Sequence, residues 1–299
     1  IYISKYQNIT TGSGETLRAL SLKHVDPRVG INFDTAITAC TQKGTGWHLM
    51  TNAEWAAIAL WCRKRGFMPR GNNNYGADHS VASEIGIGCY YDSANNKIGK
   101  VLTGSGPISW SHDGTPAGIW DLNGNVCEWV GGYRALDGEI HIIPDNNAAA
   151  QVDQGLDSTL WKAILENGSL VDPETADTLK WDYTANPGTS GEKPFRLNTT
   201  LEYQQTAEGV YGSVTFQSLT AADGVNVPEI MKALALFPAD SGDHGSDRIT
   251  MRNIGERLAF RGGSWLNGAP AGVFSLYGAN SRSHAITGLG FRSAFIPGI

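Results

Sequence analysis

Residues 118–129 read GIWDLNGNVCEW, and they lead directly into a predicted β-hairpin. Its strands are expected at residues 126–134 and 139–143. Asp137-Gly138 between them is a tight-turn dipeptide, because glycine tolerates the positive φ that such turns require. Working outward from this hairpin, the rest of the chain supplies two helices, a long loop region and a C-terminal segment rich in small residues.

The composition is that of a loop-rich globular protein. Glycine accounts for 37 of the 299 residues, and charged residues make up 17 % of the chain, against a usual share of about 25 %. The hydrophobic share of 41 % and the low charge density exclude disorder, and the composition disfavours long helical bundles. A chain of this length buries a core without disulfides. We predict an α+β fold, with short antiparallel sheets, in a single domain over residues 1–299.

Charge and hydropathy exclude two classes of partner. The net charge is −6, and the longest basic run, Arg63-Lys64-Arg65, ends a predicted helix, where cations suit the helix dipole. A nucleic-acid partner is therefore not expected. The chain has no run of 18 or more apolar residues, so membrane insertion is not expected either.

Two helices are predicted near the N-terminus. Residues 32–43 repeat apolar side chains at helical spacing, with Asn32 as the N-cap and Gly44 as the stop. Residues 51–65 begin with the capping-box pair Thr51 and Glu54, and Gly66 follows as the stop. Each helix carries one of the cysteines on its apolar face.

The remaining segments are less regular. Residues 66–120 are rich in Gly, Asn, Ser and Asp and are expected to form structured loops. Residues 144–250 are interpreted as an insertion within the single domain. This insertion contains one predicted helix, with Pro228 near its start and Pro238 as its stop.

Neither cysteines nor histidines show a ligand pattern. Cysteines at positions 40, 62, 89 and 127 contain no CxxC pair, which argues against a zinc site, and we interpret them as buried free thiols. The seven histidines have no ligand-like spacing and are interpreted as structural, although a scattered set can still converge in space.

Four motifs in order carry a family resemblance. They are WHLMTNAEW at residues 47–55, GIWDLNGNVCEW at 118–129, RGGSW at 261–265 and GFR at 290–292. This series resembles the formylglycine-generating-enzyme-like branch of the C-type-lectin fold, whose signatures include GNVWEW and paired C-terminal motifs. The resemblance implies a C-type-lectin fold for the chain, and it leaves the insertion at 144–250 unexplained.

The same resemblance raises the alternative of an enzyme. Oxidases of this branch look like copper enzymes that use a cysteine pair between the two C-terminal motifs, and related sulfoxide synthases hold iron with histidines. This chain has no cysteine after Cys127. Because the thiolates that hold a soft metal are absent from residues 261–292, we expect no catalysis. A metal-dependent oxidase with other ligands stays the alternative.

Residues 265–292 read WLNGAPAGVFSLYGANSRSHAITGLGFR. This segment resembles the variable region of proteins diversified by retroelements, in which an error-prone reverse transcriptase mutates template adenines and turns Asn codons into many residue types. The resemblance implies Asn267 and Asn280 as unmutated or invariant positions. It implies variable, ligand-binding positions at Leu266, Pro270, Ser275, Tyr277, Ala279, His284, Ile286, Gly288 and Leu289. An ordinary loop with core residues among these nine is the simpler interpretation.

A binding face of this kind predicts a protein or glycan ligand. Tyr277 is the best anchor, because it offers a large apolar face and has few rotatable side-chain bonds to immobilise on binding. Ala279 and Gly288 are expected to leave room for a protrusion of the partner. The resemblance implies receptor recognition by a phage or display on a bacterial surface, and some relatives form homo-oligomers. A fixed-specificity adhesion module is the third alternative.

A structural calcium ion is the only cofactor that the resemblance suggests. Its ligands in this chain are the side chains of Asp121 and Glu128 and the carbonyls of Gly124 and Val126, and oxygen ligands of this type suit calcium. The alternative is that the two carboxylates cap turns or pair with an arginine.

Overall fold

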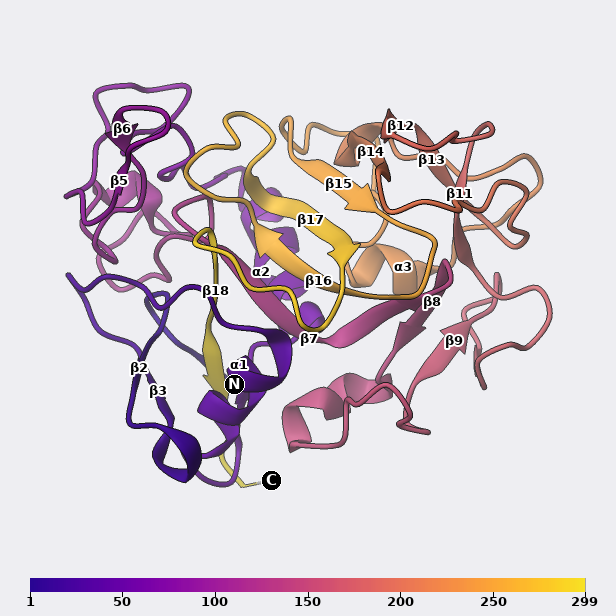
Figure 1. The fold of residues 1–299 in the computed structure, drawn as a ribbon, viewed down its shortest axis with the longest axis horizontal. Helices are drawn as coiled ribbons and strands as arrows, with labels where there is room; N and C mark the ends of the chain where they lie inside the picture. The colour runs from indigo at the N-terminus through magenta and orange to yellow at the C-terminus, as the bar shows by residue number, and fades with distance from the viewer. Residues whose placement is uncertain (299) are drawn as a thin grey trace.

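The computed structural model describes residues 1–298 and has a mixed α+β architecture that is mostly sheet (Figure 1). Its centre is a twelve-stranded mixed sheet. The main path of this sheet runs, in order, through β10 (Leu170–Val171), β9 (Lys162–Ile164), β8 (Glu139–Ile142), β7 (Cys127–Leu136), β16 (Glu256–Gly262), β17 (Gly272–Asn280), β15 (Arg248–Met251), β14 (Val210–Thr215) and β12 (Gly191–Lys193). Attached to this path are β11 (Lys180–Tyr183), β13 (Phe195–Asn198) and β18 (Leu289–Phe291).

The predicted hairpin is confirmed as β7 and β8, which pair antiparallel. Asp137 and Gly138 take φ of 46° and 88°, the two positive values that a type I′ turn needs. The prediction of short antiparallel sheets is wrong for the main sheet, because β15–β17, β12–β14 and β18–β7 are parallel pairs. Each of these pairs joins strands separated by connections long enough to cross over.

The two N-terminal helices are confirmed as α1 (Phe33–Thr41) and α2 (Asn52–Arg65). Asn32 caps the first, and the Thr51–Glu54 capping box opens the second, which Gly66 ends in the left-handed conformation at φ 68°. Gly44 does not end α1, whose C-cap is Gln42. Cys40 and Cys62 are buried, as their places on the apolar faces predicted.

The helix predicted between Pro228 and Pro238 is shorter than expected. It is α3 (Glu229–Ala233), with Pro228 as its N-cap rather than as its first helical residue. Ala235 takes a positive φ of 47°, so the chain leaves the helical conformation well before Pro238. The side chains of Met231, Ala235 and Leu236 are nevertheless fully buried.

Short sheets complete the fold. β1 (Tyr2–Ile3), β19 (Ser293–Phe295) and β4 (Trp47–Leu49) form a three-stranded sheet in which the two ends of the chain pair antiparallel. In Figure 1 the N-terminus lies in the lower part of the molecule, in front of α1 in this view. Two hairpin-like pairs, β2 (Ile9–Thr11) with β3 (Arg18–Leu20) and β5 (Tyr91–Asp92) with β6 (Lys97–Ile98), lie apart from the main sheet. Within residues 1–298, no helix is long and apolar enough to cross a membrane.

The segment 144–250 is built into the main sheet at both ends. β9 and β10 extend the sheet beyond β8, whereas β15, β14 and β12 extend it beyond β17. Trp181 and Phe195 from this segment belong to the same buried core as Trp55 and Val273. The segment therefore shares both the sheet and the core with the rest of the described chain.

Two buried arginines join the four sequence motifs in pairs. Arg292 of the GFR motif donates two hydrogen bonds to the carboxylate of Glu128, at 2.8 and 2.9 Å. Arg261 of the RGGSW motif donates to the Asn52 side-chain oxygen at 2.7 and 3.0 Å, and its remaining bonds go to backbone carbonyls. All four side chains are buried, so motifs distant in sequence meet in the core.

Replacing Arg292 by Met is expected to lower the free energy of unfolding by about 3–5 kcal/mol, because Glu128 would be left as an unpaired buried charge. Urea denaturation followed by tryptophan fluorescence measures the loss. The matched control is Arg63→Met, which breaks the more exposed pair with Asp240 and should cost less than about 1 kcal/mol. Equal losses in the two variants would contradict the central role of the buried pair.

Candidate ligand-binding cleft

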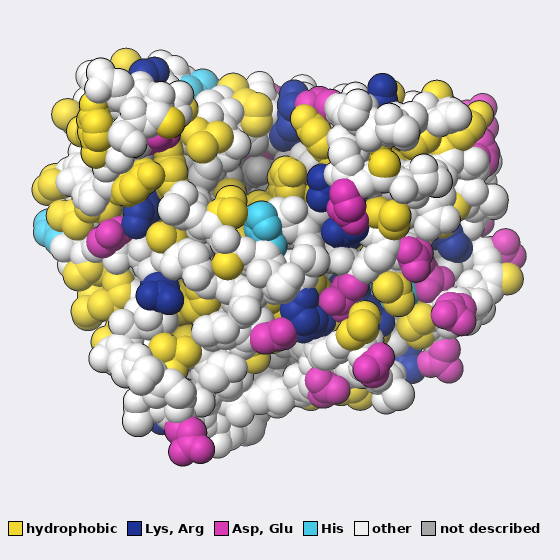
Figure 2. All heavy atoms as spheres, viewed as in Figure 1, with side chains coloured by type: hydrophobic (Ala, Val, Ile, Leu, Met, Phe, Trp, Pro, Cys, Tyr) yellow, Lys and Arg dark blue, Asp and Glu magenta, His cyan; other side chains and the backbone are white. Residues whose placement is uncertain are grey.

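A cleft of about 600 Å³ lies over one half of the main sheet. Its floor and one side come from β12, β14, β15, β17 and β16, and its other side comes from residues 263–270 and 284–288. Figure 2 shows this face of the molecule hollowed above the middle of the sheet. The volume is within the range of roughly 300–1,000 Å³ that is usual for ligand sites.

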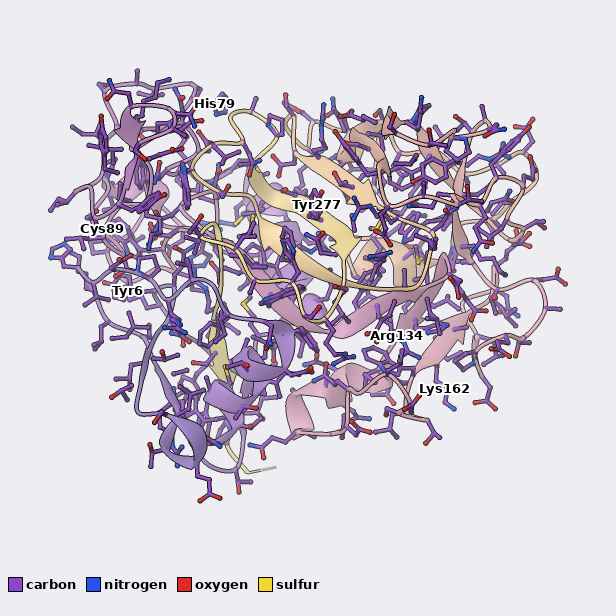
Figure 3. The ribbon with its side chains drawn as sticks, viewed as in Figure 1. Tyr6, His79, Cys89, Arg134, Lys162 and Tyr277 are labelled. Atoms are coloured by element: carbon purple, nitrogen blue, oxygen red, sulfur yellow. The ribbon has the colours of Figure 1, made fainter. Side chains whose placement is uncertain are left out.

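The cleft brings together seven of the nine positions predicted to be variable. These are Leu266, Pro270, Ser275, Tyr277, His284, Ile286 and Gly288. Leu266 and Ile286 are the most open of the large apolar side chains here, at 51 % and 46 % exposure. Figure 3 labels Tyr277, which lies on β17 in the middle of the main sheet.

The other two positions, Ala279 and Leu289, are fully buried. Leu289 starts β18 and packs in a core cluster with Trp129 and Phe291. The expectation that these two side chains meet a ligand, and that Ala279 leaves room for a partner, is therefore wrong. Simple alternation along β17 would place Ala279 on the same face as Ser275 and Tyr277, but the pairing of β16 with β17 shifts between Tyr277 and Asn280 and interrupts the alternation there.

Aromatic rings line the floor of the cleft. The rings of Phe260 and Tyr277 stack at 4.9 Å with an angle of 5° between them, and His284 lies parallel to Phe260 at 6.4 Å. Burial raises the pKa of Tyr277, whereas burial and then the charge of Arg252 lower the pKa of His284. Both rings are therefore neutral at pH 7. The floor offers flat apolar surfaces with a few polar atoms.

Cys127 also lines the cleft, at its base. Burial raises the pKa of its thiol to about 12, so the sulfur is protonated at neutral pH. Because the thiolate is the reactive form, this cysteine is a poor nucleophile. Cys40, Cys62 and Cys127 are buried free thiols as interpreted, whereas Cys89 is free but only half-buried.

The variable positions are held by their main chain rather than by their side chains. The Pro270 carbonyl accepts a hydrogen bond from the Arg248 amide at 3.0 Å, the Ile286 carbonyl from Gly30 at 3.0 Å, and the Gly288 carbonyl from Cys127 at 2.8 Å. Only Ser275, Tyr277 and His284 among the nine have polar side-chain atoms, and within residues 1–298 these three side chains form no hydrogen bond. The backbone path of this region therefore places few demands on which residues occupy the cleft positions.

Neighbouring residues fix the same path with their side chains. The Asn267 side-chain oxygen accepts from both the amide and the hydroxyl of Ser264, at 2.7 and 3.0 Å. The Asp247 carboxylate accepts from the Phe274 amide at 2.7 Å. Residues that alternate with the cleft positions thus carry the local structure.

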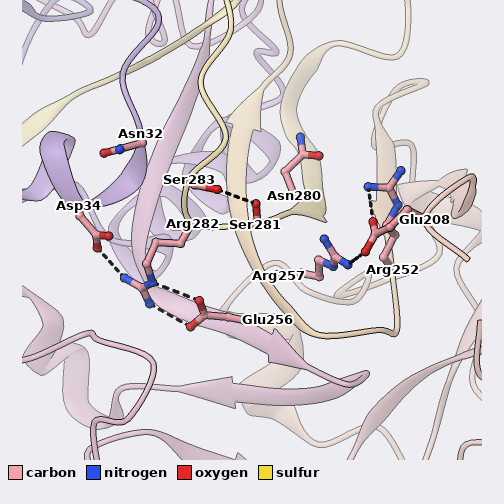
Figure 4. A pocket seen from close by; sticks show the side chains of 10 residues that line it. All are labelled: Asn32, Asp34, Glu208, Arg252, Glu256, Arg257, Asn280, Ser281, Arg282 and Ser283. Atoms are coloured by element: carbon pink, nitrogen blue, oxygen red, sulfur yellow. Dashed lines mark hydrogen bonds and ion pairs between the residues drawn. The ribbon is translucent and has the colours of Figure 1, made fainter. Parts of the chain in front are cut away.

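Arg282 anchors the loop that follows β17. Its guanidinium pairs with Asp34 at 2.6 Å and with Glu256 at 2.9 Å, as Figure 4 shows. These residues line a second, more open cavity whose lining includes three arginines and three carboxylates, all of them in ion pairs (Figure 4). Because the charges satisfy one another, this cavity offers no uncompensated group to a ligand.

Sequence reasoning missed one whole side of the cleft. Five lining residues belong to the predicted insertion: Glu192, Tyr211, Ser213, Arg248 and Thr250. No local pattern marks them, because their position depends on the pairing of β12, β14 and β15 with one another and with β17. Only the long-range pairing of strands brings them to the cleft.

The oxygens expected to hold calcium surround the side-chain amide of Gln7 instead. Its nitrogen lies 3.1, 3.3 and 2.9 Å from the carbonyl oxygens of Asp121, Gly124 and Val126, and 3.1 Å from Glu128 Oε1. Calcium takes six to eight oxygens at about 2.3–2.6 Å. The charge of Glu128 is already balanced by Arg292. This arrangement does not fit a calcium ion, and the alternative of a carboxylate paired with an arginine is confirmed for Glu128.

The Asp121 carboxylate does not join this cluster through its oxygens. Its Oδ2 accepts from the Gly104 amide at 2.8 Å, and its buried Oδ1 has no partner within residues 1–298. Burial raises the pKa of Asp121 from 3.8 to about 6, and the nearby charge of Glu128 adds to this effect. Over the same residues, no three His, Cys, Asp or Glu side chains lie close enough to share a metal ion.

Comparison with known proteins adds no family assignment. The chain matches no protein-family model, and no curated protein is significantly similar to it.

Leu266 and Leu289 form a matched pair for testing the cleft geometry. Leu289→Asn should lower the free energy of unfolding by about 3–5 kcal/mol, because it buries an amide and removes apolar packing. Leu266→Asn should change it by less than about 0.5 kcal/mol, since the side chain is half exposed. Urea denaturation of both variants measures the difference. Similar losses at the two positions would contradict the assignment of Leu266 to the open surface.

Asp121→Asn tests the buried carboxylate. Because the folded-state pKa of Asp121 is raised, its contribution to stability is full below about pH 4 and is lost as the pH rises through about 6. The variant carries no charge and keeps an acceptor for Gly104, so at pH 8 it should be more stable than the natural protein by up to about 3 kcal/mol. The difference should vanish near pH 4. Thermal unfolding of both proteins at both pH values, with calcium and with a chelator, measures the difference in stability. If the variant were less stable than the natural protein only when calcium is present, Asp121 would instead be a metal ligand.

Proposed function

We propose that this chain is a ligand-binding protein for receptor recognition, and that the cleft is its binding site. The observation that carries the proposal is the arrangement of the residues 266–288. Seven of them, the residues predicted to vary, line one cleft without forming side-chain hydrogen bonds inside the protein, while Asn267, Arg282 and the main chain hold the backbone. A site of this kind is organised before a ligand binds. The scaffold has already ordered the backbone during folding, so little conformational entropy of the backbone is lost on binding.

The same arrangement supports diversification of these positions by a retroelement. Seven cleft residues can change without loss of an internal side-chain hydrogen bond, and the two predicted positions that are buried, Ala279 and Leu289, hold small or apolar residues. A binding site on a phage or bacterial surface would gain from this tolerance, because each new set of side chains meets a partner on the same frame. Protein and glycan ligands both suit a cleft with aromatic rings and few charges.

We also propose that the fold is of the C-type-lectin type, in the branch of the formylglycine-generating enzyme. The support is that the four motifs meet in the core through Arg292 with Glu128 and Arg261 with Asn52. The oxidase activity of that branch is not part of the proposal. The thiol in the cleft, Cys127, is buried and protonated, and it has no second cysteine beside it within residues 1–298.

Sequencing this gene across its source population tests the proposal. Variation is expected at the codons of the seven cleft residues, with the codons of Asn267 and Arg282 constant. An adenine-rich near-copy of the segment and a reverse-transcriptase gene are expected nearby. An invariant segment without such a cassette would exclude diversification and leave a module of fixed specificity.

A further inference from the structure

The cleft has two sides of different origin. One side, which we call the fixed wall, consists of Glu192, Tyr211, Ser213, Arg248 and Thr250 and comes entirely from the segment 144–250. The opposite side, which we call the variable wall, consists of residues from 264 to 288, which include the positions proposed to vary. The two sides meet on the sheet, where β15 pairs with β17.

The strand register makes the floor continuous across this junction. Ser213 lies opposite Thr250, Thr250 opposite Tyr277, and Tyr277 opposite Phe260. Neighbouring strands are about 4.8 Å apart, so this row of four residues spans about 14 Å. Hydroxyl groups occupy the half of the row that comes from the segment 144–250, and aromatic rings occupy the other half. A single ligand lying along the row touches both walls.

The fixed wall offers hydrogen-bond donors and acceptors in balance. Arg248 and Glu192 form an ion pair at 2.9 Å, and both side chains are 40 % exposed. The hydroxyls of Ser213 and Thr250 lie 3.4 Å apart. The Tyr211 hydroxyl forms no hydrogen bond within residues 1–298. The wall carries no net charge. The Arg248–Glu192 pair and the Tyr211 hydroxyl can both donate and accept, whereas Ser213 and Thr250 are only 6 % and 4 % exposed.

The opposite wall is apolar by comparison. Trp265, Leu266, Pro270 and Ile286 present hydrophobic surface to the cleft, and Leu266 and Ile286 are about half exposed. A ligand that fits both walls therefore has one polar side with hydrogen-bond donors and acceptors, and a second, more apolar side whose groups can differ from ligand to ligand. An extended polypeptide has these two properties, because each residue carries one N–H, one C=O and a side chain.

We propose that the cleft binds an exposed loop of a partner protein, with the loop's main chain against the fixed wall and its side chains against the variable wall. This inference rests on the proposed function of the cleft. Main-chain groups are common to all proteins, so one fixed wall serves unrelated partners. Side-chain complementarity then comes from positions 266–288. The same division between main-chain affinity and side-chain specificity occurs in other peptide-binding sites.

The test uses the full chain with six cleft positions randomised: 266, 270, 275, 277, 284 and 286. Displayed variants are selected for binding to two unrelated folded proteins, one acidic and one basic. Arg248→Ala and Tyr211→Phe are then introduced into several selected clones for each target. Matched controls are Arg65→Ala and Tyr91→Phe, at exposed positions that do not line the cleft. Dissociation constants are measured by biolayer interferometry, and thermal unfolding checks that each variant is folded.

Arg248→Ala is expected to weaken binding by about tenfold in clones against both targets, with a smaller loss for Tyr211→Phe and no change in the controls. Clones that depend on their own selected residues but not on Arg248 or Tyr211 would overturn this inference and leave the proposed function standing. Failure to select any binder would overturn both.

A glycan ligand is the competing outcome. The natural chain is therefore also applied to an array of immobilised oligosaccharides. One outcome is that the natural chain binds an oligosaccharide and loses this binding with Arg248→Ala, while the clones selected against proteins keep their affinity when Arg248 or Tyr211 is replaced. This outcome would assign the fixed wall to a sugar and overturn the proposal of a polypeptide ligand. Absence of array binding, with fixed-wall dependence of the protein-selected clones, would support it.

Discussion

The bidentate pair between Arg292 and Glu128 is the interaction on which the rest of the structure depends. Arg292 also donates to the carbonyls of Ser4 and Trp120, so one guanidinium joins the N-terminal segment, the turn before β7 and the C-terminal strands. Both charged side chains are excluded from water, where neither is stable without the other. The side-chain nitrogen of Gln7 lies within 3.3 Å of four oxygens of this polar cluster, Glu128 Oε1 among them.

The position of the cleft follows from this anchor. β18 begins immediately after the last cleft residue, Gly288, and pairs in parallel with β7 next to Glu128. Arg292 follows β18 directly. β18 is fixed by its pairing with β7 and by Arg292 at its end, and Arg282 anchors the other end of the loop before it, so this loop has a defined path without any contribution from the side chains of its cleft residues. The residues that fix the path of this short segment are thus different from those whose side chains line the cleft.

Local signals in the sequence predicted local structure well. The Thr51–Glu54 capping box, Gly66 and Asp137-Gly138 each act within a few residues, and the elements that they bound were predicted closely. Two local signals failed, since Gly44 does not end α1 and α3 ends well before Pro238, whereas the failures at the cleft have other causes. Ala279 is buried where the pairing of β16 with β17 shifts register, and Leu289 is buried in a core cluster with Trp129 and Phe291, and a codon-based argument carries no information about either. The fixed wall depends on strand pairs whose members are far apart in the chain.

The pairing of β1 with β19 also determines how the molecule can be presented. Tyr2 lies opposite Phe295, so the two ends of the described chain lie side by side in the lower part of the view in Figure 1. Attachment of either end to a larger body would therefore hold the cleft in nearly the same orientation. Fusion partners and immobilisation tags at either end should leave the binding site equally accessible.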